Sequence, residues 1–502
     1  MKKLLLVLLL LSSPALAQSN EARTAALVAK LKANPVALRI LLTEMPKGGD
    51  LHNHLDGSVW AEDYLKWAAA DNGCIDAKTR ALSAAPCRDG QVAARGLMDR
   101  DPVFYQSTID ALSMRNFVPG LGTGEANGHD HTFVTFPRFG ALVTPHLGDS
   151  LAVTRTQAAA DHVQYMEQIT DPAGAFSPEL LGAVKTYSDS DFEASLAQVA
   201  PLLPRLVAEA RAEYDAAEAR MRAELGCGTG AAKPGCDIEV CYLFFVLRTF
   251  QPAQVFAQVA LGHALAAADP RFVGVNLVAP EDDAVALRDF SLHMRMFQFF
   301  QKKYPQVKHS LHAGEVSLGL VPPSALGFHI RDTVEIAGGT RIGHGYALRY
   351  EKDAKGLLAQ MASRQVMVEI NLSSNEITTN IRGAEHPLRT YMNAGVPWSL
   401  SADDAGVMRI DLTHEYVRAA TEQGLGYRDL KTSARNGIHY SFLPGQSLWR
   451  GKPGGPKAAA CAQDGMACES FLKANAKARI EARLEREFVR FEAKAASGGF
   501  PD

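Results

Sequence analysis

The most regular pattern in the sequence is an alternation of short apolar runs with longer amphipathic stretches. Apolar runs rich in Val, Ile, Leu and Phe that end at polar or Gly residues are typical of buried strands. We predict strands at 47–54, 162–169, 238–247, 272–278, 307–312, 340–344, 366–371 and 397–402, of which the first two are the most polar. The stretches after the later runs have helical spacing. They predict helices at 252–267, 284–303, 324–337, 352–363 and 385–394.

Eight strands that alternate with helices predict an α/β fold, a (β/α)8 barrel of the TIM type with parallel strands and right-handed crossovers. The wide spacings after the first and second strands predict long insertions at 60–230, which would partly cover the mouth of the barrel. We predict that the barrel occupies 46–450, with a helical segment at 18–45 before it and a helical extension at 451–502 after it. Further helical spacing lies at 20–44, 190–225, 411–442 and 469–496.

The first 17 residues have the pattern of a secretory signal peptide. Lys2 and Lys3 precede an apolar run at 4–11, and Ala15-Leu16-Ala17 has the small residues of a cleavage site. The run is too short to span a bilayer. We therefore expect cleavage after Ala17 and a secreted or periplasmic protein that has no membrane attachment once it is cleaved.

Export favours disulfide bonds between cysteines that lie close in the sequence. Six of the seven cysteines form local pairs within loop-like segments rich in Gly, Pro, Asp or Ala. We predict the disulfides Cys74–Cys87, Cys227–Cys236 and Cys461–Cys468. Cys241 lies within an apolar run and is expected to be a buried free thiol.

Composition narrows the class of protein further. The chain has 502 residues, of which 47% are hydrophobic and 21% charged, with a net charge of −3. These values exclude a disordered chain, a collagen-like repeat and a protein with many membrane spans. The near-neutral balance also argues against a nucleic-acid partner.

Histidine and acidic side chains gather at the ends of four predicted strands. His52 and His54 lie two residues apart at the end of the first strand, so both point to the same face. The other strand ends carry His312, Glu315, His344, Asp403 and Asp404. Since the carboxyl ends of barrel strands meet at one mouth, we expect these side chains to converge. A second pair, His129 and His131, lies in a loop-like insertion without a preceding strand and is not expected to bind metal.

This donor set predicts a metal-assisted hydrolase. Three neutral imidazoles and one carboxylate suit a divalent first-row metal, and zinc is the default choice, with one ion per chain. Zinc lowers the pKa of a bound water to about 7, which makes hydroxide available at neutral pH. The remaining acidic and histidine side chains would then be free for proton transfer and orientation.

Four motifs resemble those of the adenosine deaminase family in the amidohydrolase superfamily. They are MPKGGDLHNHLDG at 45–57, HAGE at 312–315, RIGHG at 341–345 and SADD at 401–404. The signal peptide, the helical N-terminal segment and the cysteine-bearing insertion resemble the secreted, growth-factor-type adenosine deaminases. A homodimer is an expectation that rests on this resemblance alone.

The resemblance implies a role for each residue of the mouth. The zinc ligands would be His52, His54, His312 and Asp403. Glu315 would deliver a proton to purine N1. His344 and Asp404 would orient the hydroxide that attacks C6, and Asp404 would also face N7.

Two further positions bear on the substrate. The resemblance implies that Asp56 meets the ribose 5′-hydroxyl, where its carboxylate would repel the phosphate of AMP. Ala279 stands where the family usually has Gly and where a backbone N–H would bond purine N3. The added methyl group leaves the pose of the purine open. Further departures from the family are Ala405, where Pro is common, and the partial motif at 371–375.

The expected reaction is zinc-dependent hydrolytic deamination of adenosine and 2′-deoxyadenosine to inosine and 2′-deoxyinosine, with release of ammonia. One alternative is a related hydrolase that acts on another 6-substituted purine, such as an N6-substituted adenosine or adenine, and Ala279 keeps this alternative open. The other is a secreted binding or signalling protein without turnover. The complete set of residues at the mouth argues against this second alternative.

Overall fold

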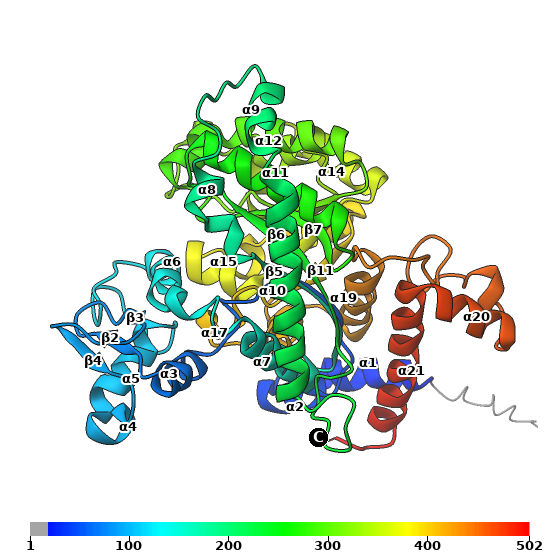
Figure 1. Ribbon diagram of the computed structural model, residues 1–502. Coiled ribbons are helices and arrows are strands. Elements are labelled where there is room, and N and C mark those ends of the chain that lie inside the picture. Colours follow the sequence, from blue (N-terminus) through cyan, green and yellow to red (C-terminus); the bar gives the residue numbers. More distant parts are fainter. Residues whose placement is uncertain (1–18, 501–502) are drawn as a thin grey trace, which may run out of the picture.

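The computed structural model describes residues 19–500, and a parallel eight-stranded barrel forms its centre (Figure 1). The predicted signal peptide lies outside the described residues. The strands are β1 (Gly48–His54), β5 (Val163–Thr170), β6 (Glu239–Leu247), β7 (Phe272–Val278), β8 (Lys308–Ala313), β9 (Arg341–His344), β10 (Met367–Ile370) and β11 (Trp398–Leu400). They pair in this order, so neighbouring strands follow one another along the chain.

The barrel closes between its last and first strands at the residues of greatest chemical interest. Asn53 and Asp403 form a parallel bridge. The Asp403 backbone N–H donates to the His52 carbonyl at 2.8 Å, and the His54 N–H donates to the Asp403 carbonyl at 3.2 Å. The predicted (β/α)8 barrel is therefore confirmed.

Helices follow the later strands as the apolar pattern predicts. Strands β1 and β5 are buried along their whole length, although both carry polar side chains such as Asp50 and Glu167. The helices between the later strands are α11 (Pro252–Ala268), α12 (Ala284–Lys303), α13 (His329–Glu335), α14 (Ala354–Arg364), α15 (Leu372–Thr379) and α16 (Leu388–Ala394). Helix α13 is shorter than the predicted helix at 324–337, because a 3-10 turn at Pro323–Ala325 replaces its start. The short α17 (Ala405–Met408), then α18 (Leu412–Thr421) and α19 (Tyr427–His439), complete the barrel region.

The terminal segments pack against each other beside the barrel. Residues 20–44 form two helices, α1 (Asn20–Leu31) and α2 (Pro35–Thr43), because Asn34 caps a new helix that begins at Pro35. The predicted C-terminal helix is also divided, into α20 (Met466–Ala474) and α21 (Ala476–Ala496), by the extended backbone of Asn475. Helix α21 packs against α1 (Figure 1). No helix within 19–500 is both long and apolar enough to span a bilayer.

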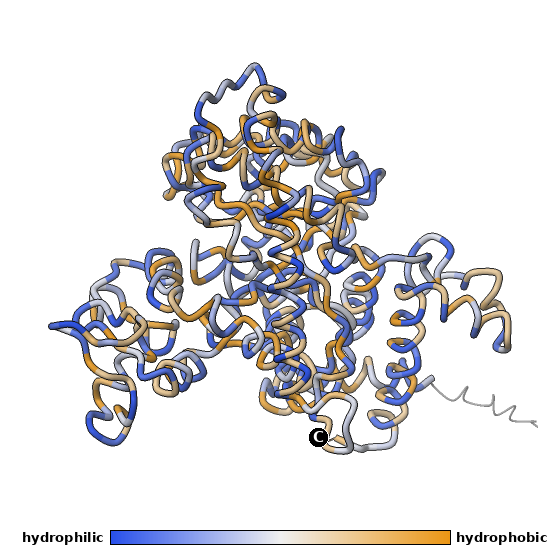
Figure 2. The backbone as a smooth tube through the Cα atoms, viewed as in Figure 1, coloured by the Kyte–Doolittle hydropathy of each residue, from blue (hydrophilic) through white to orange (hydrophobic). Residues whose placement is uncertain are grey.

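Two insertions extend from the barrel. The first follows β1 and carries α3 (Ala61–Ala70), α4 (Leu97–Arg100), α5 (Pro102–Ala111), α6 (Gly128–Phe139) and α7 (Leu147–Ala160). It also has a small antiparallel sheet made of β2 (Cys74–Asp76), β3 (Leu82–Ser83) and β4 (Gln91–Ala93), and an apolar cluster of its own. The second follows β5 and carries α8 (Pro178–Leu181), α9 (Phe192–Val199) and α10 (Leu203–Glu224). Figure 2 shows polar residues at the outer tips of both insertions.

The three predicted disulfides are present. Cys74–Cys87 lies in the first insertion, Cys227–Cys236 lies between α10 and β6, and Cys461–Cys468 lies beside α20. Cys241 is a buried free thiol in β6, as predicted.

Candidate active site

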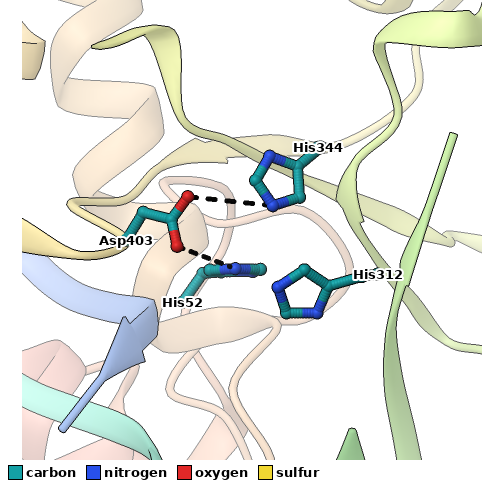
Figure 3. Close-up of side chains that lie close together, drawn as sticks. All are labelled: His52, His312, His344 and Asp403. Atoms are coloured by element: carbon teal, nitrogen blue, oxygen red, sulfur yellow. Dashed lines mark ion pairs between the residues drawn. The ribbon is translucent and has the colours of Figure 1, made fainter. Parts of the chain in front are cut away.

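Four histidines and one aspartate converge where the barrel strands end. Figure 3 shows three of these histidines, His52, His312 and His344, together with Asp403. His54 Nε2 lies 3.2 Å from His312 Nε2 and 3.5 Å from Asp403 Oδ1. His52 Nε2 lies 3.5 Å from the same Asp403 oxygen, and His344 Nε2 lies 3.7 Å from Asp403 Oδ2. The four predicted zinc ligands are thus assembled, with His344 beside them.

The backbone is bent at two of these positions. His344 has a φ of 64° and Asp403 a φ of 59°, both in the left-handed region, which costs about 1–2 kcal/mol for a residue with a side chain. His344 is the last residue of β9 and Asp403 lies three residues after the end of β11, and both side chains point to the centre of the mouth (Figure 3). Gly343 keeps the space beside them open, since a Cβ there would lie 2.7 Å from the His52 ring.

Hydrogen bonds on the outer ring nitrogens set the orientation of three histidines. Nδ1 of His52 contacts Glu369 Oε2 at 2.7 Å. Nδ1 of His312 contacts Asn276 Oδ1 at 2.8 Å, and Nδ1 of His344 contacts Asn375 Oδ1 at 2.8 Å. Because an oxygen acceptor faces each Nδ1, that nitrogen carries the proton and Nε2 presents its lone pair to the mouth.

Glu369 belongs to a buried chain of charges. Its Oε1 accepts hydrogen bonds from Arg341 Nε at 2.6 Å and from Ser310 Oγ at 2.8 Å. Arg341 also pairs with Glu167 at 2.6 Å. Burial alone would raise the pKa of Glu369, but Arg341 and His52 lower it, so the carboxylate stays charged against His52. The arginine of the RIGHG motif thus stabilises the residue that orients His52.

The donor set fits a divalent metal. Burial lowers the pKa of His54 to about 3 and that of His312 well below its usual value, so both imidazoles are neutral at neutral pH. Burial would lower the pKa of His52 too, but Asp403 and Glu369 raise it to about 10. Nε2 of His52 has no hydrogen-bond partner among the described residues. With this pKa, a proton occupies Nε2 of His52 beside Asp403 when no ion is bound. A metal cation between the two groups, as in a tetrahedral zinc site, would take the place of that proton and bind the freed lone pair.

Two acidic side chains lie beside the histidines. Oε1 of Glu315 is 3.7 Å from His344 Nε2, and burial raises the pKa of Glu315, which favours its protonated form. Burial and the nearby Asp403 raise the pKa of Asp404 well above its usual value. Only Gly fits at Gly57, because a Cβ there would lie 1.8 Å from Asp404 Oδ1.

A cavity of about 500 Å³ opens over these groups. Eight of the nine predicted site residues line it, and the ninth, His52, is fully buried behind them. Its walls are largely apolar, and α6 contributes Phe133, Phe136 and Pro137. The expectation that His129 and His131 lie in a loop is wrong, and the wall formed by α6 was not predicted. Both lie in α6, where His129 contacts Asp282 and His131 contacts Glu125.

The two predicted specificity residues both line the cavity. Asp56 accepts a hydrogen bond from the Gly57 N–H at 2.9 Å, and burial raises its pKa to about 6. Ala279 has a φ of 80°, a conformation that favours Gly. Among residues 19–500, no Lys or Arg side chain lines the cavity.

Sequence reasoning missed the residues that orient the histidines: Asn276, Glu369 and Asn375. The available signal was weak. Glu369 is a carboxylate within the apolar run at 366–371, and a buried charge in such a run needs a partner. Asn276 interrupts the run at 272–278 in the same way.

Comparison with known proteins supports the same family. The family model described as adenosine deaminase matches residues 204–448. The adenosine deaminase of Shewanella loihica is 36% identical over 111 residues, which make up 22% of this chain and 33% of that protein. The Escherichia coli adenosine deaminase is 33% identical over 135 residues, which make up 27% of this chain and 37% of that protein. The match thus spans about a third of the length of these relatives.

Solved structures share the barrel fold at low identity. The N6-methyl-AMP deaminase of Arabidopsis thaliana has a TM-score of 0.52 and 21% identity, covering 81% of this chain and 94% of that chain. An amidohydrolase from Burkholderia ambifaria, solved with bound zinc, has a TM-score of 0.56 and 17% identity, covering 92% of this chain and 95% of that chain.

Proposed function

We propose that this chain, whose residues 204–448 match the adenosine deaminase family, deaminates adenosine and 2′-deoxyadenosine by hydrolysis. The products are inosine or 2′-deoxyinosine and ammonia. The observation that carries the proposal is the convergence of seven side chains in and directly beneath one apolar-walled cavity. They are His52, His54, His312, Glu315, His344, Asp403 and Asp404.

The metal ligands in this proposal are His52, His54, His312 and Asp403, which hold one zinc ion. Bound zinc supplies hydroxide at neutral pH and polarises the reacting centre. His344 is left out of the ligand set on the resemblance to the family alone, because the structure also groups its ring with His52, His312 and Asp403. Its Nε2 lies 3.7 Å from Glu315 Oε1 and 3.7 Å from Asp403 Oδ2. That place suits a residue that orients the attacking water.

The remaining residues move protons. Glu315, whose pKa is raised by burial, donates a proton to purine N1 and makes C6 electrophilic. The oxygen of water bonds to C6, and the C6–N6 bond breaks. N1 keeps one proton, and the amino group leaves as ammonia with the other. His344 and Asp404 orient the water and carry the second proton to the leaving group.

The cavity favours a nucleoside over a nucleotide. A 5′-phosphate needs cationic or N–H donors, and no Lys or Arg from the described chain lines the cavity. The carboxylate of Asp56 would instead repel a phosphate. AMP is therefore expected to be a poor substrate, although a fold neighbour is an N6-methyl-AMP deaminase.

A second candidate substrate is an N6-alkylated adenosine. The observation that favours it is the apolar wall formed by Phe133, Phe136 and Pro137, which would accept an alkyl group without leaving a polar group unpaired. The chemistry is the same, with an alkylamine as the leaving group.

We also propose that the protein is exported by the segment at 1–17. The three disulfides support this, because such bonds persist in oxidising compartments. Cell fractionation of the native protein, with and without residues 1–17, tests it. Release into the periplasm or medium only with the segment is expected, and equal retention in the cytoplasm would contradict it.

Ultraviolet absorbance of purified protein with adenosine tests the function. A rapid change from the adenine to the hypoxanthine spectrum is expected, with loss of turnover after chelation and recovery with zinc. Adenosine, N6-methyladenosine, adenine and AMP are compared in parallel, and Glu315→Gln should abolish turnover of each. Bound zinc without turnover of any of them would refute the proposal.

A further inference from the structure

The HAGE turn, which carries Glu315, rests on a buried carboxylate that neither the motifs nor the proposed mechanism uses. Glu281 follows β7 and is 1% exposed. Its Oε2 accepts a hydrogen bond from the Glu315 backbone N–H at 2.8 Å, and its Oε1 accepts one from the Gly314 N–H at 3.0 Å. The same Oε1 contacts Nδ1 of His329.

The two bonded amides define the turn that aims Glu315. Gly314 has a φ of 73°, and the chain reverses there directly after β8. Among residues 19–500, the carboxyl of Glu315 itself makes no hydrogen bond, and its Oε1 lies 3.7 Å from His344 Nε2. The direction of the Glu315 side chain is therefore set by its backbone, and Glu281 holds that backbone.

Glu281 is itself rigidly held. Burial alone would raise its pKa, but His329 and Arg248 lower it to about 2, so it is a carboxylate at any relevant pH. His329 stacks on Phe290, with ring centroids 3.9 Å apart. Arg248 lies 3.5 Å from Glu281 and donates to the Leu277 carbonyl at 2.7 Å, which ties the carboxylate to β7.

We propose that Glu281 is a positioning residue that acts through Glu315 and places the proton donor for the attack on the purine. The inference rests on the proposed role of Glu315 in deamination. Glu281 lies in the same loop as Ala279, which lines the cavity, and it holds the turn that carries Glu315. It therefore connects the cavity wall at Ala279 to the proton donor Glu315. A change at Glu281 is thus expected to alter the position of Glu315 relative to the purine ring and to leave the metal ligands in place.

Glu281→Gln is a sharp perturbation, because every group around the carboxylate is a hydrogen-bond donor. An amide offers one oxygen only, so its NH₂ group must face the Gly314 and His329 donors or the Glu315 N–H. At least one bond to the turn is lost, and two donors are brought together in a buried site.

The matched control is Glu351→Gln. Glu351 is 5% exposed and also accepts two backbone N–H bonds, from Ile330 at 2.7 Å and from Arg331 at 3.4 Å, but it makes no contact with Glu315. The Glu351→Gln variant therefore measures the effect on kcat and hydrogen exchange of replacing a buried glutamate that accepts backbone hydrogen bonds but does not contact Glu315.

The experiment combines hydrogen exchange with steady-state kinetics on the zinc-loaded protein. In Glu281→Gln, the amides of Gly314 and Glu315 are expected to exchange about tenfold faster. The kcat for adenosine is expected to fall by about 100-fold, as a shift of about 1 Å in a catalytic group causes. KM and zinc content should stay within about threefold of the wild type. In Glu351→Gln, exchange at the turn and kcat should stay close to wild type.

Several outcomes overturn the proposal. Unchanged exchange and unchanged kcat in Glu281→Gln would do so, as would an equal loss of kcat in both variants. If Glu281→Gln does not fold, Glu281→Asp replaces it, and the shorter carboxylate should give an intermediate rise in exchange and an intermediate loss of kcat. The exchange measurement needs no turnover. Faster exchange at the turn in a protein that turns over no purine would therefore support the contact while refuting the proposed function.

Discussion

Glu369→Gln should weaken zinc binding without removing any ligand. In the structure three donors surround this carboxylate: His52 Nδ1 at 2.7 Å, Arg341 Nε at 2.6 Å and Ser310 Oγ at 2.8 Å. The oxygen of a glutamine satisfies Arg341 and Ser310 best, so its NH₂ group faces His52. His52 Nδ1 must then accept, which moves the ring proton to Nε2, the atom that should bind zinc.

The expected size of the effect follows from this change of tautomer. Loss of an outer hydrogen bond to a histidine ligand reduces metal affinity by about 10–100-fold, or about 1.4–2.8 kcal/mol. The buried position of both groups, each with a side chain 0% exposed, places the effect near the upper end, because water cannot replace the lost acceptor.

Competition with a chromophoric chelator measures the zinc dissociation constant of each variant. Glu167→Gln is the matched control, since Glu167 is equally buried and also pairs with Arg341, at 2.6 Å, without touching His52. We expect it to keep zinc affinity within about threefold. An equal weakening in both variants would show that net charge, not the tautomer of His52, controls binding. Wild-type affinity in Glu369→Gln would refute the reasoning altogether.

Three further predictions concern substrate, strain and pH. Asp56→Asn should reduce the preference for adenosine over AMP by about tenfold or more in kcat/KM. Because burial raises the Asp56 pKa from 3.8 to about 6, ionisation of Asp56 destabilises the folded wild type as the pH rises from about 4 to 6. The free energy of unfolding of Asp56→Asn relative to that of the wild type should therefore increase over this range and stay constant above it. Ala279→Gly should stabilise the protein by about 0.5–1 kcal/mol in thermal unfolding, because relief of the strained φ exceeds the cost of the added conformational entropy of the unfolded chain. The control is Ala337→Gly, which should destabilise the protein because Ala337 is buried and has no positive φ. The raised pKa of Glu315 predicts that kcat/KM falls on the alkaline side as Glu315 loses its proton; a flat profile up to pH 9 would contradict a proton-donor role.

The eight strands could be predicted to within about two residues because several are buried apolar runs and they alternate with helical stretches. The convergence of His52, His312, His344 and Asp403 followed from strand ends meeting at one mouth. By contrast, the pairing of Glu369 with His52 joins residues 317 positions apart, and nothing in either local sequence marks it. The strands of the small sheet have only two or three residues and no detectable period.

Helix α6 shows a different limit. Asn127 caps it, but its place over the mouth depends on tertiary packing. A Cβ at Gly128 would lie 2.4 Å from the Ile377 carbonyl of α15, and His129 contacts Asp282 at 3.0 Å in the loop after β7. These contacts are made between segments far apart in the chain, so the segment at 128–132 was taken for a loop.

The reaction is easier to infer from this sequence than the substrate, because the barrel carries the candidate chemical groups and the insertions carry much of the cavity wall. The atoms that would bind metal and move protons lie on β1, β8, β9 and the turn after β11, where strand geometry dictates their direction. Much of the apolar wall that meets the substrate comes from α6 and from Phe176, which lie in the insertions after β1 and β5. Insertions can change without disturbing the strand ends, so a preserved metal group is compatible with several 6-substituted purines. Under the proposed function, Asp56 and Ala279 would be the specificity residues that lie on the barrel, and the choice between adenosine and its N6-alkyl derivatives would depend on Phe133 and Phe136.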